Sequence, residues 1–162
     1  MNSSELAWIL REKLTLDIME RMVTGGPELD EYNRRAREYN ALAVTIEYKE
    51  SDMTSARRLV EGMKIDITRD AVAETMSLAM PIRAMSDQNI DTVWRIQKLL
   101  SLFGYYAGAI NGEENEGTVS AVKMYELKSG SPITGRIDKK LAETLTGSWI
   151  ARNTPADVSL GK

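Results

Sequence analysis

The sequence predicts an all-α protein, in which a helical N-terminal region precedes a smaller three-helix domain. Apolar residues recur three and four positions apart through most of the 162 residues, which is the period of an amphipathic helix. Glycines, prolines and capping residues interrupt this pattern where helices would end. The hydrophobic content of 43% suffices for one good core or two small ones.

The first helix is predicted over residues 4–23. Asn2 and Glu5 have the spacing of a capping box. The apolar positions that follow are Leu6, Ile9, Leu10, Leu14, Leu16, Ile18, Met19, Met22 and Val23. A helix this apolar needs burial on two sides, or a partner.

The second helix is predicted to begin at Pro27, because the missing amide hydrogen costs nothing at the first helical position. A heptad seam follows at Leu29, Tyr32, Ala36, Tyr39, Ala43 and Ile46. The seam is too short for an independent coiled coil. It predicts packing within this chain, and the alternative is a helix bundle shared between subunits.

Two more helices are predicted before the central proline. Ser51 or Asp52 can cap the third helix, and Gly62 is predicted to break it. The fourth helix then runs to Pro81, which cannot continue a helix.

Three short helices are predicted in the C-terminal part. Asp91 or Thr92 can cap the first, Thr118 the second and Asp138 the third. The predicted organisation is a helical assembly region of about four helices over residues 1–80, a linker over 81–90, a three-helix domain over 91–147 and an irregular tail over 148–162. Trp149 and Ile150 are exceptions within the tail, because so large an apolar pair is expected to dock on the protein's own surface. The alternative is docking on a partner.

Composition excludes several kinds of chemistry. The chain has neither cysteine nor histidine, so thiol nucleophiles, Ser-His-Asp catalysis and the usual zinc hydrolase sites cannot form. We expect no metal and no other cofactor. A glycosidase with two carboxylates remains chemically possible, and Glu12, Glu20, Asp30 and Glu31 are its candidates. These residues lie on strongly polar helix faces, where solvation is the ordinary role, so we expect no enzyme.

Charge and hydropathy bear on partners and location. The net charge is −3 and the basic residues do not cluster, which argues against a nucleic-acid partner. The N-terminus does not resemble a secretory signal, and no apolar run approaches the ~20 residues that span a bilayer. We therefore expect a protein that is made in the cytoplasm without a signal peptide and that has no transmembrane segment.

Two ordered motifs lie in the predicted three-helix domain. The first reads Gly-Tyr-x-x-Gly-x-Ile-Asn-Gly, with Gly104, Tyr105, Gly108, Ile110, Asn111 and Gly112. The second reads Pro-x-Thr-Gly-x-Ile-Asp, with Pro132, Thr134, Gly135, Ile137 and Asp138. Together with Gln97, this order resembles the peptidoglycan-binding domain family, a three-helix module of bacterial and phage cell-wall proteins. The resemblance implies non-catalytic binding of the cell wall.

One loop departs from the family pattern. The family's turn usually reads Asp-Gly-x-(Phe/Tyr)-Gly, whereas Glu114 replaces the aromatic residue here. Aromatic side chains are common ligand contacts, so the loss of this ring matters for sugar binding. The remaining candidates for ligand contacts are Tyr105, Tyr106, Asn111 and Arg136.

The leading hypothesis is a non-enzymatic peptidoglycan-binding protein, either a bacteriophage virion component or a lysis accessory, whose helical region forms oligomers with other subunits. The alternative is a purely structural virion or assembly protein that uses the same fold for protein–protein contacts. The acidic loop at Glu113 and Glu114 favours this alternative.

Overall fold

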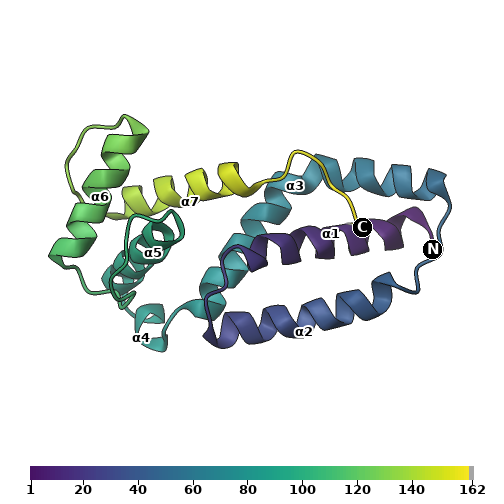
Figure 1. The fold of residues 1–162 in the computed structure, drawn as a ribbon, viewed down its shortest axis with the longest axis horizontal. Coiled ribbons are helices and arrows are strands. Elements are labelled where there is room, and N and C mark those ends of the chain that lie inside the picture. The colour runs from purple at the N-terminus through teal and green to yellow at the C-terminus, as the bar shows by residue number, and fades with distance from the viewer. Residues whose placement is uncertain (161–162) are drawn as a thin grey trace. The chain divides into compact units, whose positions relative to one another are not determined.

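The computed structural model describes residues 1–160, and these residues form helices without strands, as the sequence predicts (Figure 1). The helices are α1 (Ser3–Glu20), α2 (Gly26–Ala43), α3 (Glu50–Ala79), α4 (Ile82–Met85), α5 (Gln88–Leu102), α6 (Glu116–Ser129) and α7 (Lys139–Asn153). They belong to two units. The N-terminal bundle comprises residues 1–79 and 150–160, and the C-terminal domain comprises Met80–Trp149.

Helix α1 lies between α2 and α3 and contacts both (Figure 1). This arrangement explains its broad apolar face, because residues on different sides of the helix are buried, including Leu6, Ile9, Leu10, Ile18 and Met19. The predicted capping box is confirmed. The Asn2 side chain accepts a hydrogen bond from the Glu5 amide at 3.0 Å, and the Glu5 carboxylate accepts one from the Asn2 amide at 2.8 Å.

The heptad seam of α2 packs within the chain, which confirms the first of the two interpretations. Tyr39 is buried with Ile9 and Leu16 of α1, and the seam residues Tyr32, Ala36, Ala43 and Ile46 pack against this cluster. Leu160 of the C-terminal segment packs there too, and its carbonyl accepts a hydrogen bond from the Tyr39 hydroxyl at 3.2 Å.

The predicted break near Gly62 is wrong, because α3 runs without interruption from Glu50 to Ala79. Three long helices therefore precede Pro81, not about four. Gly62 lies on the exposed face, where a helical glycine costs only about 1 kcal/mol. The opposite face stays buried on both sides of Gly62, at Val60 and Ile67, and this burial outweighs the local cost.

The tail is more regular than the sequence predicts, since α7 continues to Asn153. The prediction of irregular structure from residue 148 is therefore wrong for residues 148–153. Trp149 confirms the expectation of docking on the protein's own surface: it is buried, and its ring meets Phe103 edge-on at a centroid distance of 5.3 Å. This burial holds the last turns of the helix in place.

Residues 154–160 return to the N-terminal bundle and bind α3. The Ala156 carbonyl accepts a hydrogen bond from the Lys64 ammonium at 2.6 Å. The Val158 amide donates to the Glu61 carboxylate at 2.7 Å, and the Val158 side chain is buried. The bundle is thus built from two separate stretches of the chain.

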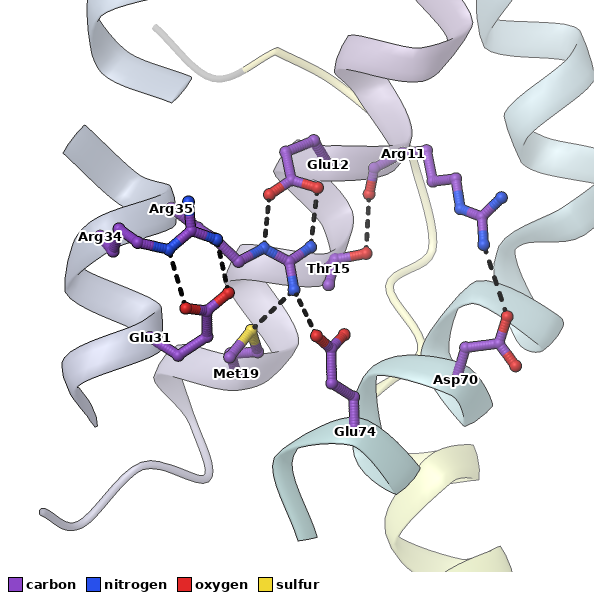
Figure 2. A network of polar contacts seen from close by, with 9 residues as sticks. All are labelled: Arg11, Glu12, Thr15, Met19, Glu31, Arg34, Arg35, Asp70 and Glu74. Carbon is purple, nitrogen blue, oxygen red and sulfur yellow. Dashed lines mark hydrogen bonds and ion pairs between the residues drawn. The ribbon is translucent and has the colours of Figure 1, made fainter. Parts of the chain in front are cut away.

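A largely buried arginine links all three long helices of the bundle. Figure 2 shows Arg35 of α2 binding Glu12 of α1 with two hydrogen bonds of 2.7 Å. The same guanidinium donates to Glu74 of α3 at 2.9 Å. The Arg35 and Glu12 side chains are only 14% and 19% exposed, whereas that of Glu74 is 46% exposed. Glu12 is therefore the stronger partner.

The two carboxylates are expected to contribute unequally to stability. Glu12→Gln should lower the free energy of unfolding by about 1–2 kcal/mol, because it leaves a largely buried guanidinium without its bidentate partner. Glu74→Gln should cost less than about 0.5 kcal/mol, since its ion pair is half exposed. Urea unfolding of the two variants measures the difference, and equal costs would contradict this account.

The C-terminal domain contains α4, α5, α6 and α7 as far as Trp149. Two of the three predicted helix caps are wrong. Asp87 caps α5, accepting hydrogen bonds from the Asn89 and Ile90 amides, whereas Asp91 binds Arg95 one turn further along. Asn115, not Thr118, caps α6. The predicted capping of α7 by Asp138 is confirmed, because its carboxylate accepts a hydrogen bond from the Leu141 amide at 2.9 Å.

The predicted linker lies partly in helix, at α4 and the first turn of α5. The domain's core is formed by the buried apolar residues Val93, Trp94, Ile96, Leu99, Leu100, Ala121, Val122, Tyr125, Leu145 and Trp149. This core fixes the ends of α5, α6 and α7, from which the two loops described next extend.

Candidate functional site

The loop between α5 and α6 is held by one buried side chain. Gln97, which is 0% exposed, accepts hydrogen bonds from the Asn111 and Gly112 amides at 3.0 and 2.9 Å. Its amide nitrogen donates to the Glu113 carbonyl at 2.9 Å and to the Thr118 hydroxyl at 3.1 Å. Gln97 thus satisfies the polar groups with which the loop meets the core.

Tyr106 and Asn111, two of the predicted ligand contacts, are engaged within this loop. Tyr106 is only 6% exposed, and its hydroxyl donates to the Ala109 carbonyl at 2.8 Å. A side chain at Gly108 would meet the same hydroxyl at 2.6 Å, so the loop closes directly over the ring. The Asn111 side chain accepts a hydrogen bond from the Glu113 amide at 3.0 Å. Both residues therefore shape the loop from inside.

Tyr105, the third predicted contact, belongs to an aromatic cluster. Its ring lies 6.2 Å from that of Tyr125 in an edge-on arrangement and 6.5 Å from that of Phe103. The side chain is partly exposed, whereas Tyr125 is buried. Tyr105 is thus the predicted tyrosine that the structure leaves partly open to solvent.

The loop between α6 and α7 is held in the same way, by a buried carboxylate. Glu126, 8% exposed, accepts hydrogen bonds from the Thr134 amide and hydroxyl, both at 2.7 Å, and from the Gly135 amide at 2.9 Å. Burial raises the pKa of Glu126, but these hydrogen bonds outweigh it and hold the pKa below the ordinary value of 4.5.

The second loop forms one side of a groove, which we call the α6–α7 groove. It has a volume of about 320 Å³, and its lining includes Tyr125, Pro132, Arg136, Asp138, Lys140 and Leu141. Arg136 and Lys140 have no ion-pair partner among residues 1–160. Two cationic side chains are therefore free to meet a ligand.

The structure brings together only part of the predicted set. Arg136 lines the groove, and Tyr105 contacts Tyr125, which also lines it. Tyr106 and Asn111 belong to the other loop. Sequence reasoning missed Lys140, although its position one turn after Arg136 in a loop-to-helix junction was a usable signal.

Two of the four carboxylates considered for glycoside hydrolysis, those of Glu12 and Glu31, form ion pairs with arginines. Figure 2 shows Glu12 bound to Arg35 and Glu31 bound to Arg34, the latter at 2.6 and 2.8 Å. The hydrogen bond from Arg34 lowers the pKa of Glu31. A glycosidase's general acid needs the opposite shift, so Glu31 is poorly suited to that role.

Residues 1–160 contain neither a metal-binding cluster of side chains nor a helix suited to span a bilayer. Among residues 1–160, His, Cys, Asp and Glu form no group of three or more that could hold a metal ion. None of the described helices is long and apolar enough to cross a membrane.

Acidification is expected to destabilise the C-terminal domain through Glu126. Because folding lowers its pKa, the ionised carboxylate stabilises the domain above the ordinary value of 4.5, and this contribution is lost as pH falls through the lowered value. Glu126→Gln should be less stable near neutral pH and should lose less on acidification. Urea unfolding at about pH 7 and about pH 3 tests this, and an equal acid sensitivity of both proteins would refute it.

The comparisons with known proteins bear on this domain. Residues 91–145 match the family model described as "Putative peptidoglycan binding domain". Neither the curated proteins nor the solved structures gave a match to the chain. The matched residues include Gln97, both loops and the whole groove lining. The C-terminal part of this chain, from residue 91 to 145, is therefore a domain of the peptidoglycan-binding family.

Proposed function

We propose that this protein binds bacterial peptidoglycan without cleaving it, and that the α6–α7 groove is the binding site. The family match carries the proposal, because the matched model describes a binding domain and not a catalytic one. The groove supports it, since about 320 Å³ falls within the range of small-ligand sites. On this proposal Arg136 contacts the ligand and Tyr105 borders it, while Tyr106 and Asn111 shape the neighbouring loop.

Co-sedimentation of the full chain with purified, intact sacculi tests the proposal. We expect retention of the wild-type protein and a clear loss for Arg136→Ala. Lys128→Ala is the matched control, because Lys128 is an exposed cation of α6 outside the groove lining. Failure of the wild-type protein to sediment with sacculi would end the proposal, and equal retention of both variants would remove the groove from it.

The setting of this binding is a further part of the proposal. We propose a phage virion component or a lysis accessory that acts at the cell envelope, with the N-terminal bundle as its assembly region. The heptad seam of α2 is occupied within the chain, so assembly would use another surface. Trp8, Leu59 and Met63 of the bundle are about half exposed and suit such contacts.

A purely structural role is the second candidate, and these exposed side chains are the observation that favours it. Light scattering separates the two. A discrete oligomer that sacculi do not retain supports the structural role, whereas retention by sacculi supports the binding role whatever the mass.

A further inference from the structure

The charged side chains that line the α6–α7 groove differ in how far they are already hydrogen-bonded within the protein. The Glu126 carboxylate already accepts three hydrogen bonds, two from Thr134 and one from Gly135. Asp138 uses one oxygen to cap α7 through the Leu141 amide. The cations are different, because both are exposed and neither has an ion-pair partner among the described residues. The charged groups that remain free to hydrogen-bond a ligand in this groove are therefore the guanidinium of Arg136 and the ammonium of Lys140.

The groove offers little to a sugar ring. Tyr125 is the aromatic residue in its lining, and it is only 9% exposed. Its ring contacts those of Phe103 and Tyr105, and its hydroxyl shares a hydrogen bond with Ser148 at 3.0 Å. Stacking on a sugar would need an open ring face, and this ring is packed into the domain.

The remaining lining suits a short peptide that carries a carboxylate. A guanidinium binds a carboxylate with two parallel hydrogen bonds, and an ammonium adds a second positive charge. Arg136 and Lys140 provide these two groups in one groove. Pro132 and Leu141 provide apolar surface for small side chains.

We propose that the α6–α7 groove recognises the peptide portion of peptidoglycan through a free carboxylate, and not the glycan strand. This inference rests on the proposed function and specifies its ligand. Arg136 makes the bidentate contact, and Lys140 supplies the second charge. Amidation of the carboxylate removes the charge and one acceptor oxygen, so amidated wall peptides bind poorly.

Isothermal titration of the full chain with three probes tests the inference. The probes are a synthetic stem pentapeptide with free carboxylates, the same peptide with its carboxylates amidated, and a peptide-free oligomer of N-acetylglucosamine. We expect the free peptide to bind at least tenfold more tightly than the other two, and added salt to weaken it. A tenfold change corresponds to about 1.4 kcal/mol.

Variants of Arg136 and Lys140 test whether these two side chains bind the carboxylate of the peptide. Arg136→Ala and Lys140→Ala should each lower the affinity for the free peptide by about tenfold, Arg136→Lys should retain part of it, and Lys128→Ala should leave it unchanged. Circular dichroism of each variant establishes that it is folded.

The outcomes separate this inference from the proposed function. Three results would overturn the inference alone, provided that sacculi retain the chain. These are equal binding of the free and amidated peptides, a preference for the sugar oligomer, and no binding of the free peptide. A chain that intact sacculi do not retain would overturn both.

Discussion

Gly112→Ala is expected to lower the free energy of unfolding of the C-terminal domain by about 3 kcal/mol or more. Gly112 has φ +78°, and a Cβ atom there would lie 2.5 Å from the Ile90 Cγ2 atom and 2.9 Å from the Ile90 carbonyl oxygen. The backbone oxygen cannot move aside as a flexible side chain would. The substitution should therefore force the loop off α5.

Gly130→Ala is the matched control. Gly130 also has a left-handed backbone, with φ +72°, but nothing lies within 4 Å of an added Cβ atom. Only the backbone strain of about 1 kcal/mol remains. Urea unfolding can be followed by tryptophan fluorescence, because Trp94 and Trp149 are buried in this domain. Similar losses for the two variants would show that the close approach to Ile90 is unimportant.

The second large effect is expected at Gln97. Gln97→Leu keeps the approximate volume but leaves the Asn111 and Gly112 amides without their acceptor and the Glu113 carbonyl without the closer of its two donors. Each buried polar group that loses its partner costs about 1–3 kcal/mol, so a total of about 3 kcal/mol is expected.

Gln88→Leu provides the comparison for this prediction. Gln88 is exposed in the first turn of α5, so its replacement should change stability by less than about 0.5 kcal/mol. Amide NMR spectra should show the Gln97→Leu changes concentrated in the loop between α5 and α6. A loss below about 1 kcal/mol with an undisturbed loop would be incompatible with the role assigned to Gln97.

Some features set by local chemistry could be predicted from the sequence, although the caps of α5 and α6 were not. The capping box at Asn2 and the Asp138 cap each depend on residues close in the chain, and the structure has both. The matched family domain also lies where the ordered motifs indicated it.

Features set by distant contacts could not be predicted in the same way. Gly62 was expected to break a helix, but burial of the opposite face of α3 against the bundle keeps it intact. The last turns of α7 depend on Trp149 meeting Phe103, which is 46 positions earlier in the sequence. In both cases tertiary burial outweighs a weak local preference.

In the candidate site, too, some features could be predicted from the sequence and others could not. The order of the motifs located both loops. It could not show that Tyr106 is buried beneath its loop, or that the Glu126 carboxylate accepts hydrogen bonds from the second loop. Those facts depend on which side of a loop a side chain takes. That Tyr105, Tyr106, Asn111 and Arg136 contact a ligand stays a prediction.

The most direct test of the account is to locate the bound ligand on the protein. Soluble muropeptides released from sacculi would be titrated into the ¹⁵N-labelled full chain, and the amide shifts mapped. We predict saturable shifts concentrated at Tyr125 and residues 131–144, with the N-terminal bundle unaffected. Shifts confined to the bundle or to the loop between α5 and α6, or no shifts with a folded protein, would contradict the assignment of the groove.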